Sequence, residues 1–229
     1  MAKPTASAGP SARAVAPVRR PELALPELRP HDADALRPDG DHDGASFTDL
    51  DLDGADGGGS TFLECALRGC SLNGTRLTRA RLLDSELTGV RGVGTELAGA
   101  EVRDVELTDA RLGGTQLHGA RLTRVVVRGG KIDFLNLRQS TLTDVAFEGC
   151  VLVEPDLAGA RLERVSFTDC ALRGVDLSGA TLRDVDLRGV AELDIAAGFD
   201  RLAGAVVSTV QLMDLAPAFA AQLGVRVED

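Results

Sequence analysis

The chain has very few aromatic residues: it contains no Trp and no Tyr, and only 3% of its 229 residues are aromatic. A core built mainly from rings is therefore excluded, and so is the stacking of nucleic-acid bases on aromatic side chains. The chain also lacks any apolar run close to the roughly 18 residues of a membrane span. Its N-terminal residues lack the continuous apolar segment of a signal peptide. We therefore expect a cytoplasmic protein with no membrane partner.

Cysteine and histidine are scarce and form no metal-binding pattern. The four cysteines have no CxxC spacing, and the three histidines do not cluster with them. Cys150 and Cys170 lie twenty residues apart, so a disulfide or a metal pair is one interpretation. The preferred interpretation is that the thiols are buried and act as small apolar side chains. We expect neither a metal nor a cofactor.

The residues that carry out catalysis in enzymes do not converge in this sequence. Catalysis needs several polar groups in one pocket, but the only histidine within the regular part of the chain, His118, takes an outward position. No glycine-rich phosphate motif of the GxxxxGK[ST] or GxGxxG kind follows a strand and opens a helix. We therefore expect no enzyme activity and no small-molecule substrate. A net charge of −10 also opposes direct binding of nucleic acid.

What the chain does contain is a period of five residues, unbroken from Ala45 to Gly189. The third residue of each block is almost always large and apolar, the first is small or compact and never charged, and the fifth is often Gly. Neither a helix, with 3.6 residues per turn, nor a plain strand, with a period of two, has this repeat. First and third residues on the same side suit a short extended piece, and glycine suits the turn that follows it.

A chain that turns every five residues closes a square coil in about twenty, and stacked coils pair their backbones at roughly 4.8 Å. Each buried Leu contributes roughly 1.5–3 kcal/mol, so even a narrow column can be stable. Gly57 and Gly92 take third positions, where each removes a core side chain and predicts a weak point or a bulge. The predicted core residues are Phe47, Leu67, Leu87, Leu112, Leu137, Phe147, Leu162, Phe167 and Leu182.

Blocks such as Val175-Asp-Leu177-Ser-Gly match the pattern A(D/N)LXX, and over about two-thirds of its length the chain resembles the pentapeptide-repeat proteins. The resemblance implies an all-β solenoid, a right-handed quadrilateral parallel β-helix of pentapeptide repeats. It implies much less about activity, because function depends on particular sites and one fold carries many functions.

The repeat divides the chain into three segments. Residues 1–44 hold seven of the nine prolines and are predicted to be a mostly disordered tail; residues 21–44 either lie over the first coil and shield its edge or stay flexible. Residues 45–189 are predicted to form the β-helix. Residues 190–229 are predicted to form a final strand and a short helical cap that begins at Ser208 or Thr209. Pro217 is expected to kink this helix or to start a second one.

Two stacks of like charge mark candidate partner surfaces. Residues twenty apart share a face, and like charges opposite each other destabilise a sheet, which favours a partner that neutralises them. The alternative is solvated charge at no cost, because the side chains splay apart. The acidic stack is Glu86 and Glu106, with Asp109 nearby, and the basic column is Arg91, Arg111 and Lys131.

The favoured function is a non-catalytic scaffold that acts through protein–protein interaction with an unidentified partner. The alternative, implied by resemblance to the quinolone-resistance members of the family, is a DNA mimic that binds DNA gyrase or another topoisomerase and modulates quinolone sensitivity. Mimicry needs a continuous acidic surface, but only the face through Phe47 leans acidic, and Arg68 and Arg128 interrupt it. The same members of the family imply a homodimer formed through the C-terminal cap.

Overall fold

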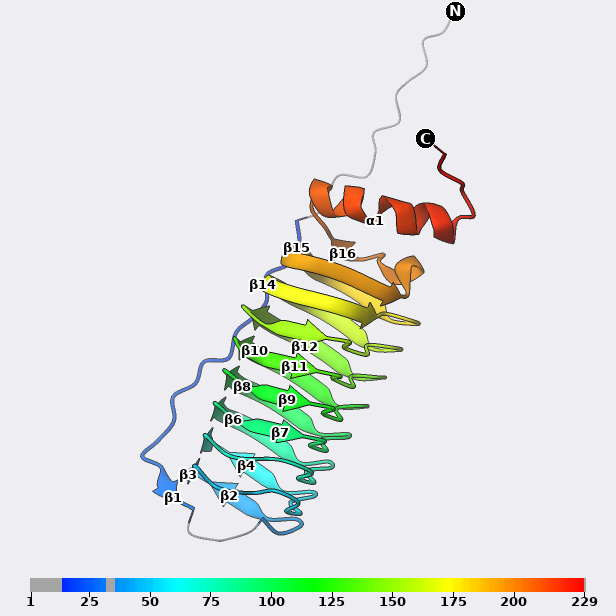
Figure 1. Cartoon of the computed structure of the whole chain (residues 1–229). Coiled ribbons are helices and arrows are strands. Elements are labelled where there is room, and N and C mark those ends of the chain that lie inside the picture. The colour runs from blue at the N-terminus through cyan, green and yellow to red at the C-terminus, as the bar shows by residue number, and fades with distance from the viewer. Residues whose placement is uncertain (1–13, 32–35, 229) are drawn as a thin grey trace, which may run out of the picture.

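The computed structural model describes residues 14–31 and 36–228, which form a parallel β-helix closed at one end by a helix (Figure 1). Strands on successive coils pair in parallel, and through most of the repeat a residue pairs with the one twenty places further along, as Leu122 does with Leu142. The predicted β-helix with a C-terminal helical cap is therefore confirmed.

The strands differ in length because some turn a corner of the coil whereas others cover a single face. Short strands form at both ends of the solenoid, and the two longest lie next to the cap (Figure 1). The strands are β1 (Arg29–Pro30), β2 (Asp41–Asp43), β3 (Ala45–Thr48), β4 (Thr61–Leu63), β5 (Ala66–Arg68), β6 (Arg81–Thr88), β7 (Arg91–Val93), β8 (Glu101–Thr108), β9 (Arg111–Gly113), β10 (Arg121–Arg128), β11 (Lys131–Asp133), β12 (Thr141–Glu148), β13 (Val151–Val153), β14 (Arg161–Asp176), β15 (Thr181–Ala197) and β16 (Ala205–Val206). The helices are the 3-10 turn η1 (Phe199–Arg201) and α1 (Thr209–Gln222).

Third-position side chains point into the solenoid and form one apolar column. Seven of the nine predicted core residues are buried, with exposed fractions of 0 to 7%, whereas Leu87 and Leu112 are half-buried and pack against the column. Phe147 and Phe167 stack one coil apart, with ring centroids separated by 4.9 Å. First-position residues such as Ala80 are buried as well, so both the first and the third side chains of a block face the interior.

Aromatic side chains stack on one another at the first coil. His31, which follows β1, stacks on Phe47 with the ring centroids 4.3 Å apart, and His42 stacks on Phe62 at 4.8 Å. Burial, with a smaller contribution from His31, lowers the pKa of His42. The column therefore begins with a stack of aromatic rings, and the lowered pKa favours the neutral form of His42 near pH 7.

The fifth residue of nearly every block makes the turn with a positive φ, and Gly189 is an exception. Gly69 has φ 65°, and Asp84 and Phe134 have φ 48° and 54°. An L side chain rarely adopts this conformation, glycine adopts it freely, and Asp tolerates it better than most residues. This requirement explains why glycine is so frequent at the fifth position. Larger side chains also occur there, as at Arg124 and Arg164 with φ 52°, and the ring of Phe134 is exposed.

The two missing core side chains have different outcomes. A Cβ on Gly57 would lie 3.2 Å from Cβ of Leu36, so buried Leu36 takes the space that a third-position side chain would fill. A Cβ on Gly92 would lie 2.9 Å from the carbonyl oxygen of Leu72, so the backbones of these two coils approach each other too closely for a side chain at position 92. An apolar cavity of about 100 Å³ remains inside these coils and is lined in part by Leu72 and Leu112.

The register changes next to the cap. Thr168 pairs with Gly189 and Leu172 with Leu193, but Val175 pairs with Ile195, so the spacing alternates between twenty and twenty-one residues along β14 and β15. The Ser208 side chain caps α1 by accepting a hydrogen bond from the Gln211 N–H, and the Gln211 side chain accepts one from the Ser208 N–H. Gln211 also donates to two carbonyls of the last coil. α1 continues as one helix through Pro217.

Residues 14–28, which we call the strap, form neither helix nor strand. They run along one edge of the solenoid, from the level of Asp184 near the cap to β1 at the opposite end (Figure 1). The sequence predicts a mostly disordered tail over residues 1–44. Residues 1–13 and 32–35 of it lie outside the described residues, whereas Ala16 and Arg19 bind the solenoid. The division of the chain at residues 44 and 189 stays a prediction.

The apolar column predicts how much stability is lost when one of its side chains is shortened. Leu142 is fully buried on β12, so Leu142→Ala should lower the free energy of unfolding by about 2–5 kcal/mol. Arg121→Ala, at an exposed site one coil away, is the control and should change it by no more than about 0.5 kcal/mol. Urea unfolding followed by far-ultraviolet circular dichroism measures both. Equal effects of the two substitutions would show that residue 142 does not face the column.

Candidate partner surfaces

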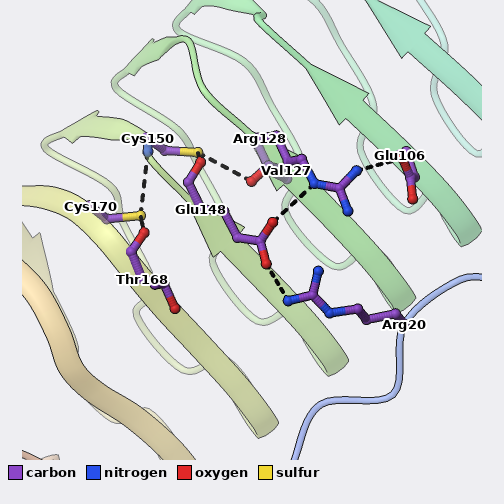
Figure 2. Close-up of polar contacts among 8 residues, drawn as sticks. All are labelled: Arg20, Glu106, Val127, Arg128, Glu148, Cys150, Thr168 and Cys170. Carbon is purple, nitrogen blue, oxygen red and sulfur yellow. Dashed lines mark hydrogen bonds and ion pairs between the residues drawn. The ribbon is translucent and has the colours of Figure 1, made fainter.

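On the face that leans acidic in the sequence, carboxylates are paired with arginines (Figure 2). Arg128, at the end of β10, donates from Nη1 to Glu106 at 2.7 Å and from Nε to Glu148 at 3.0 Å. Arg20 of the strap binds the other carboxylate oxygen of Glu148. Three coils and the strap are thereby joined by a charged ladder, Glu106–Arg128–Glu148–Arg20.

The predicted acidic stack is also paired. Glu86 of β6 lies in register with Glu106 of β8, so the structure brings these two carboxylates together. Glu86 binds Arg68 and Glu106 binds Arg128, so each carboxylate has an arginine from a neighbouring coil. Asp109 lies at the following corner, where it is exposed and forms no ion pair with any other described residue. The like charges of the stack are therefore largely neutralised within the chain.

The charges of the basic column are less completely neutralised within the chain than those of the acidic stack. Arg91, Arg111 and Lys131 lie in register on β7, β9 and β11. Lys131 forms an ion pair with Asp133 at 2.7 Å, and Arg91 donates to a backbone carbonyl at 3.2 Å. Within residues 14–31 and 36–228, Arg111 has neither an ion pair nor a side-chain hydrogen bond. The centre of the column is therefore free to bind an anionic group.

An open hollow of about 570 Å³ lies beside the basic column. Gly113 contributes to the hollow because it carries no side chain at an outward position, and Gly92 lies in the wall of the hollow. All three residues of the basic column line it, as do Asn73 and Asp133. The hollow places three positive side chains around an accessible concave surface.

Two carboxylates at the strap have lowered pKa values. Burial alone would raise the pKa of Asp144, but hydrogen bonds from the Arg164 guanidinium and the Arg19 N–H outweigh burial and lower it. The same balance lowers the pKa of Glu148, with the arginines of the charged ladder as donors. Both groups are therefore held in the charged form that the strap contacts require.

The cysteines lie inside the solenoid as free, buried thiols. The Cys150 N–H donates to the Cys170 sulfur at 3.4 Å, and the Cys150 thiol donates to a backbone carbonyl of the preceding coil (Figure 2). Burial raises the pKa of Cys65 and Cys70. The neighbouring side chain of Cys170, together with burial, raises the pKa of the Cys150 thiol. Among the described residues, no group of His, Cys, Asp and Glu side chains has an arrangement suited to a metal ion.

The cap exposes apolar side chains. Leu215 is the buried residue of α1, and Phe219 packs partly against Phe199 of η1. The exposed apolar residues of this region are Val210, Leu212, Met213, Leu223, Val225 and Val227. In the part of the chain that the structure describes, no helix combines the length and apolar character needed to cross a membrane.

A family profile for the pentapeptide repeat region matches residues 60–137 and 140–193, which is more than half of the chain. The chain belongs to the pentapeptide-repeat family. Its repeats are the five-residue blocks whose third side chains build the column. A comparison with curated proteins gives no match to this pentapeptide-repeat chain.

Solved structures of other pentapeptide-repeat proteins are similar. A trypsin-treated variant of QnrB1, a plasmid-mediated fluoroquinolone resistance protein, is 16% identical, covers 90% of this chain and 100% of its own, and gives a TM-score of 0.48. HetL, a protein involved in heterocyst differentiation regulation from the cyanobacterium Nostoc sp. strain PCC 7120, is 21% identical over 74% of this chain and 90% of its own, with a TM-score of 0.37. Likeness at these identities concerns the fold and not the activity.

The strap contacts were not predicted from the sequence. They involve Asp144 and Asp184, fifth-position residues at corners, where the repeat pattern predicts only turns. The sequence does carry a sign of a covered edge in the outward-facing second and fourth positions of the blocks, which normally hold polar residues. Ala66, Leu83, Val126 and Ala146 are apolar residues in such slots, and all four are buried.

The ion pair between Asp144 and Arg164 predicts the pH at which the Asp144 carboxyl group titrates. Its lowered pKa means that the contribution of the charged carboxylate to stability is complete above its unfolded pKa of about 3.9 and is lost as the pH falls through the lower folded value. Carbon-13 NMR of the carboxyl group should give a pKa below 3.9 in the folded protein. Arg164→Ala should raise it, because the guanidinium hydrogen bonds are lost. An unchanged pKa in that variant would show that the arginine does not hold the carboxylate.

Proposed function

We propose that the protein is a non-catalytic scaffold that binds an acidic segment of another protein on the basic column. The observation that carries the proposal is the register of Arg91, Arg111 and Lys131 beside an open hollow. Like charges one coil apart repel each other. A carboxylate-rich partner relieves this repulsion and gains charge-assisted hydrogen bonds.

The arrangement of charge on the other faces supports this choice of surface. Arg124 binds Asp104 one coil away, and Arg164 binds Asp144 in the same manner. Such ion pairs leave little free charge for a partner. The basic column departs from this pattern, because only Lys131 has an ion pair in the chain as described. Surface charge that is left unpaired within the chain is available for steering and binding a partner.

The same pairing argues against phosphate mimicry directed at DNA gyrase. A mimic must present uncompensated acidic groups along its surface. On the acidic-leaning face, Glu86, Glu106 and Glu148 bind arginines of neighbouring coils or of the strap. We therefore place an acidic protein partner ahead of the gyrase alternative. The four buried free thiols suit a reducing compartment, and we propose a cytoplasmic location.

A labelled oligoglutamate peptide tests the basic column. Fluorescence anisotropy should show binding that weakens as salt is added, because the contact is electrostatic. Arg111→Ala should weaken binding about fivefold, the ratio that corresponds to loss of one partly exposed charge contact. The matched control is Arg81→Ala, which removes an exposed arginine whose ion pair with Glu101 lies on another face. Equal binding by the two variants, or no binding at low salt, would remove this surface from consideration.

We also propose that two copies associate through the cap, because α1 leaves large apolar side chains in water. Met213 is 70% exposed, and its apolar neighbours on the helix are exposed too. Contiguous exposed apolar surface commonly marks an interaction site. A symmetric contact between two caps would bury these side chains and leave the faces of both solenoids accessible.

Size-exclusion chromatography with light scattering tests the cap contact. The unaltered protein should elute as a dimer at micromolar concentration, and Met213→Glu should give a monomer, because burying a carboxylate without a partner is costly. Arg188→Glu, on the solenoid, is a control that should leave the dimer intact. A monomeric unaltered protein, or a dimeric Met213→Glu variant, would show that the cap is not the interface.

A further inference from the structure

One edge of the solenoid is covered even though its side chains point away from the core. The covered edge consists of Ala66, Leu83, Val126 and Ala146, together with the carboxylates of Asp144 and Glu148. The four apolar residues are between 0 and 4% exposed, although outward residues of the next face, such as Arg91 and Arg111, are exposed. Something outside the coils therefore shields this edge from water.

The strap supplies the cover. The Ala16 N–H donates to Asp184 at 3.4 Å, and the Arg19 N–H donates to Asp144 at 3.1 Å. Three residues of strap thus span two coils, which matches an extended chain of about 3.3 Å per residue across coils about 4.8 Å apart. Further along, Pro21 is buried and Leu23 and Leu25 are half-buried, whereas the residues between them are exposed. The strap lays alternate side chains on the edge, as an extended peptide does.

The strap is attached differently from the strands. Between residues 14 and 28, the backbone contacts to the solenoid are the two N–H groups that bind Asp144 and Asp184, and the Arg20 guanidinium adds an ion pair with Glu148. Ladder pairing begins only at β1, where Arg29 lies in register with Ala45. Lifting residues 14–28 therefore breaks no pairing between coils, and such segments open more easily than the fold as a whole.

We propose that the covered edge is a binding surface for an extended peptide of another protein, and that the strap is its built-in, displaceable occupant. The peptide carries apolar side chains at alternate positions and an arginine at the level of Glu148. That arginine completes the charged ladder, because Glu148 then accepts from it and from Arg128. The chain's own segment shows that this chemistry fits the surface.

The strap is covalently joined to the solenoid, and this link determines which peptide can replace it. A segment joined to its site has a high effective concentration. A second copy of the chain offers the same segment without that advantage, so it cannot compete well. A peptide of another protein can have more apolar contacts or a second arginine, and it can therefore displace the strap. This inference is independent of the basic column, which lies on a different face and makes no contact with the strap.

The experiment uses the full-length chain and a fluorescent peptide with the sequence of residues 14–28. Arg20→Glu places a carboxylate against Glu148 and should loosen the strap. The variant should bind the peptide about fivefold more tightly than the unaltered chain, the ratio expected for one partly exposed ion pair. Hydrogen exchange of residues 14–28 should rise in the same variant. The matched control is Arg138→Glu, because Arg20 and Arg138 have side-chain exposures of 54% and 55% and each binds one carboxylate.

A charge reversal makes the test specific. In a chain with both Arg20→Glu and Glu148→Arg, the strap should close again and peptide binding should return to the level of the unaltered chain. Peptide binding that is the same in Arg20→Glu, Arg138→Glu and the unaltered chain would overturn the proposal, as would unchanged hydrogen exchange of the strap. Dimers of the Arg20→Glu variant that exchange their straps would also overturn it, in favour of a second copy as the occupant.

Discussion

The structure depends on one constraint: through most of the repeat, each residue lies beside the residue twenty places further on, at the roughly 4.8 Å spacing of paired strands. The register that places Leu122 over Leu142 also places Glu86 beside Glu106 and Arg91 beside Arg111. Core and surface therefore follow one rule, and a charge at any slot has fixed neighbours above and below. Compatibility between coils limits the choice of residue at every position.

The surface meets this constraint in two ways. At the corners, Arg124 and Arg164 bind the aspartates one coil earlier, so charges of opposite sign alternate along the stack. Beyond the coils, the strap brings a further arginine to Glu148 and covers the apolar side chains of the edge. The basic column is left largely uncompensated, which is why we assign partner binding to it. The two proposed binding surfaces thus differ in kind, because one is open and the other already has an occupant.

The period of five was sufficient to predict the coil, the apolar column and the turns, because each depends on residues at fixed spacing. The sequence did not predict that Leu36 fills the space beside Gly57, since Leu36 lies outside the repeat. The course of the strap could not be derived either, because its partners Asp144 and Asp184 look like ordinary turn residues. The like-charge stack at Glu86 was recognised, but its neutralisation by Arg68 depends on side-chain geometry between coils.

Disulfide trapping tests the register most directly. Residues 121 and 141 are paired on β10 and β12, so their Cα atoms lie about 4.8 Å apart, within the range that a disulfide spans. Residue 143 lies two places further along the strand, roughly 8 Å from residue 121. The account predicts that the double substitution Arg121→Cys and Thr141→Cys oxidises readily within one chain, whereas Arg121→Cys with Thr143→Cys does not. Efficient cross-linking of the second pair, with none in the first, would contradict a coil of twenty residues.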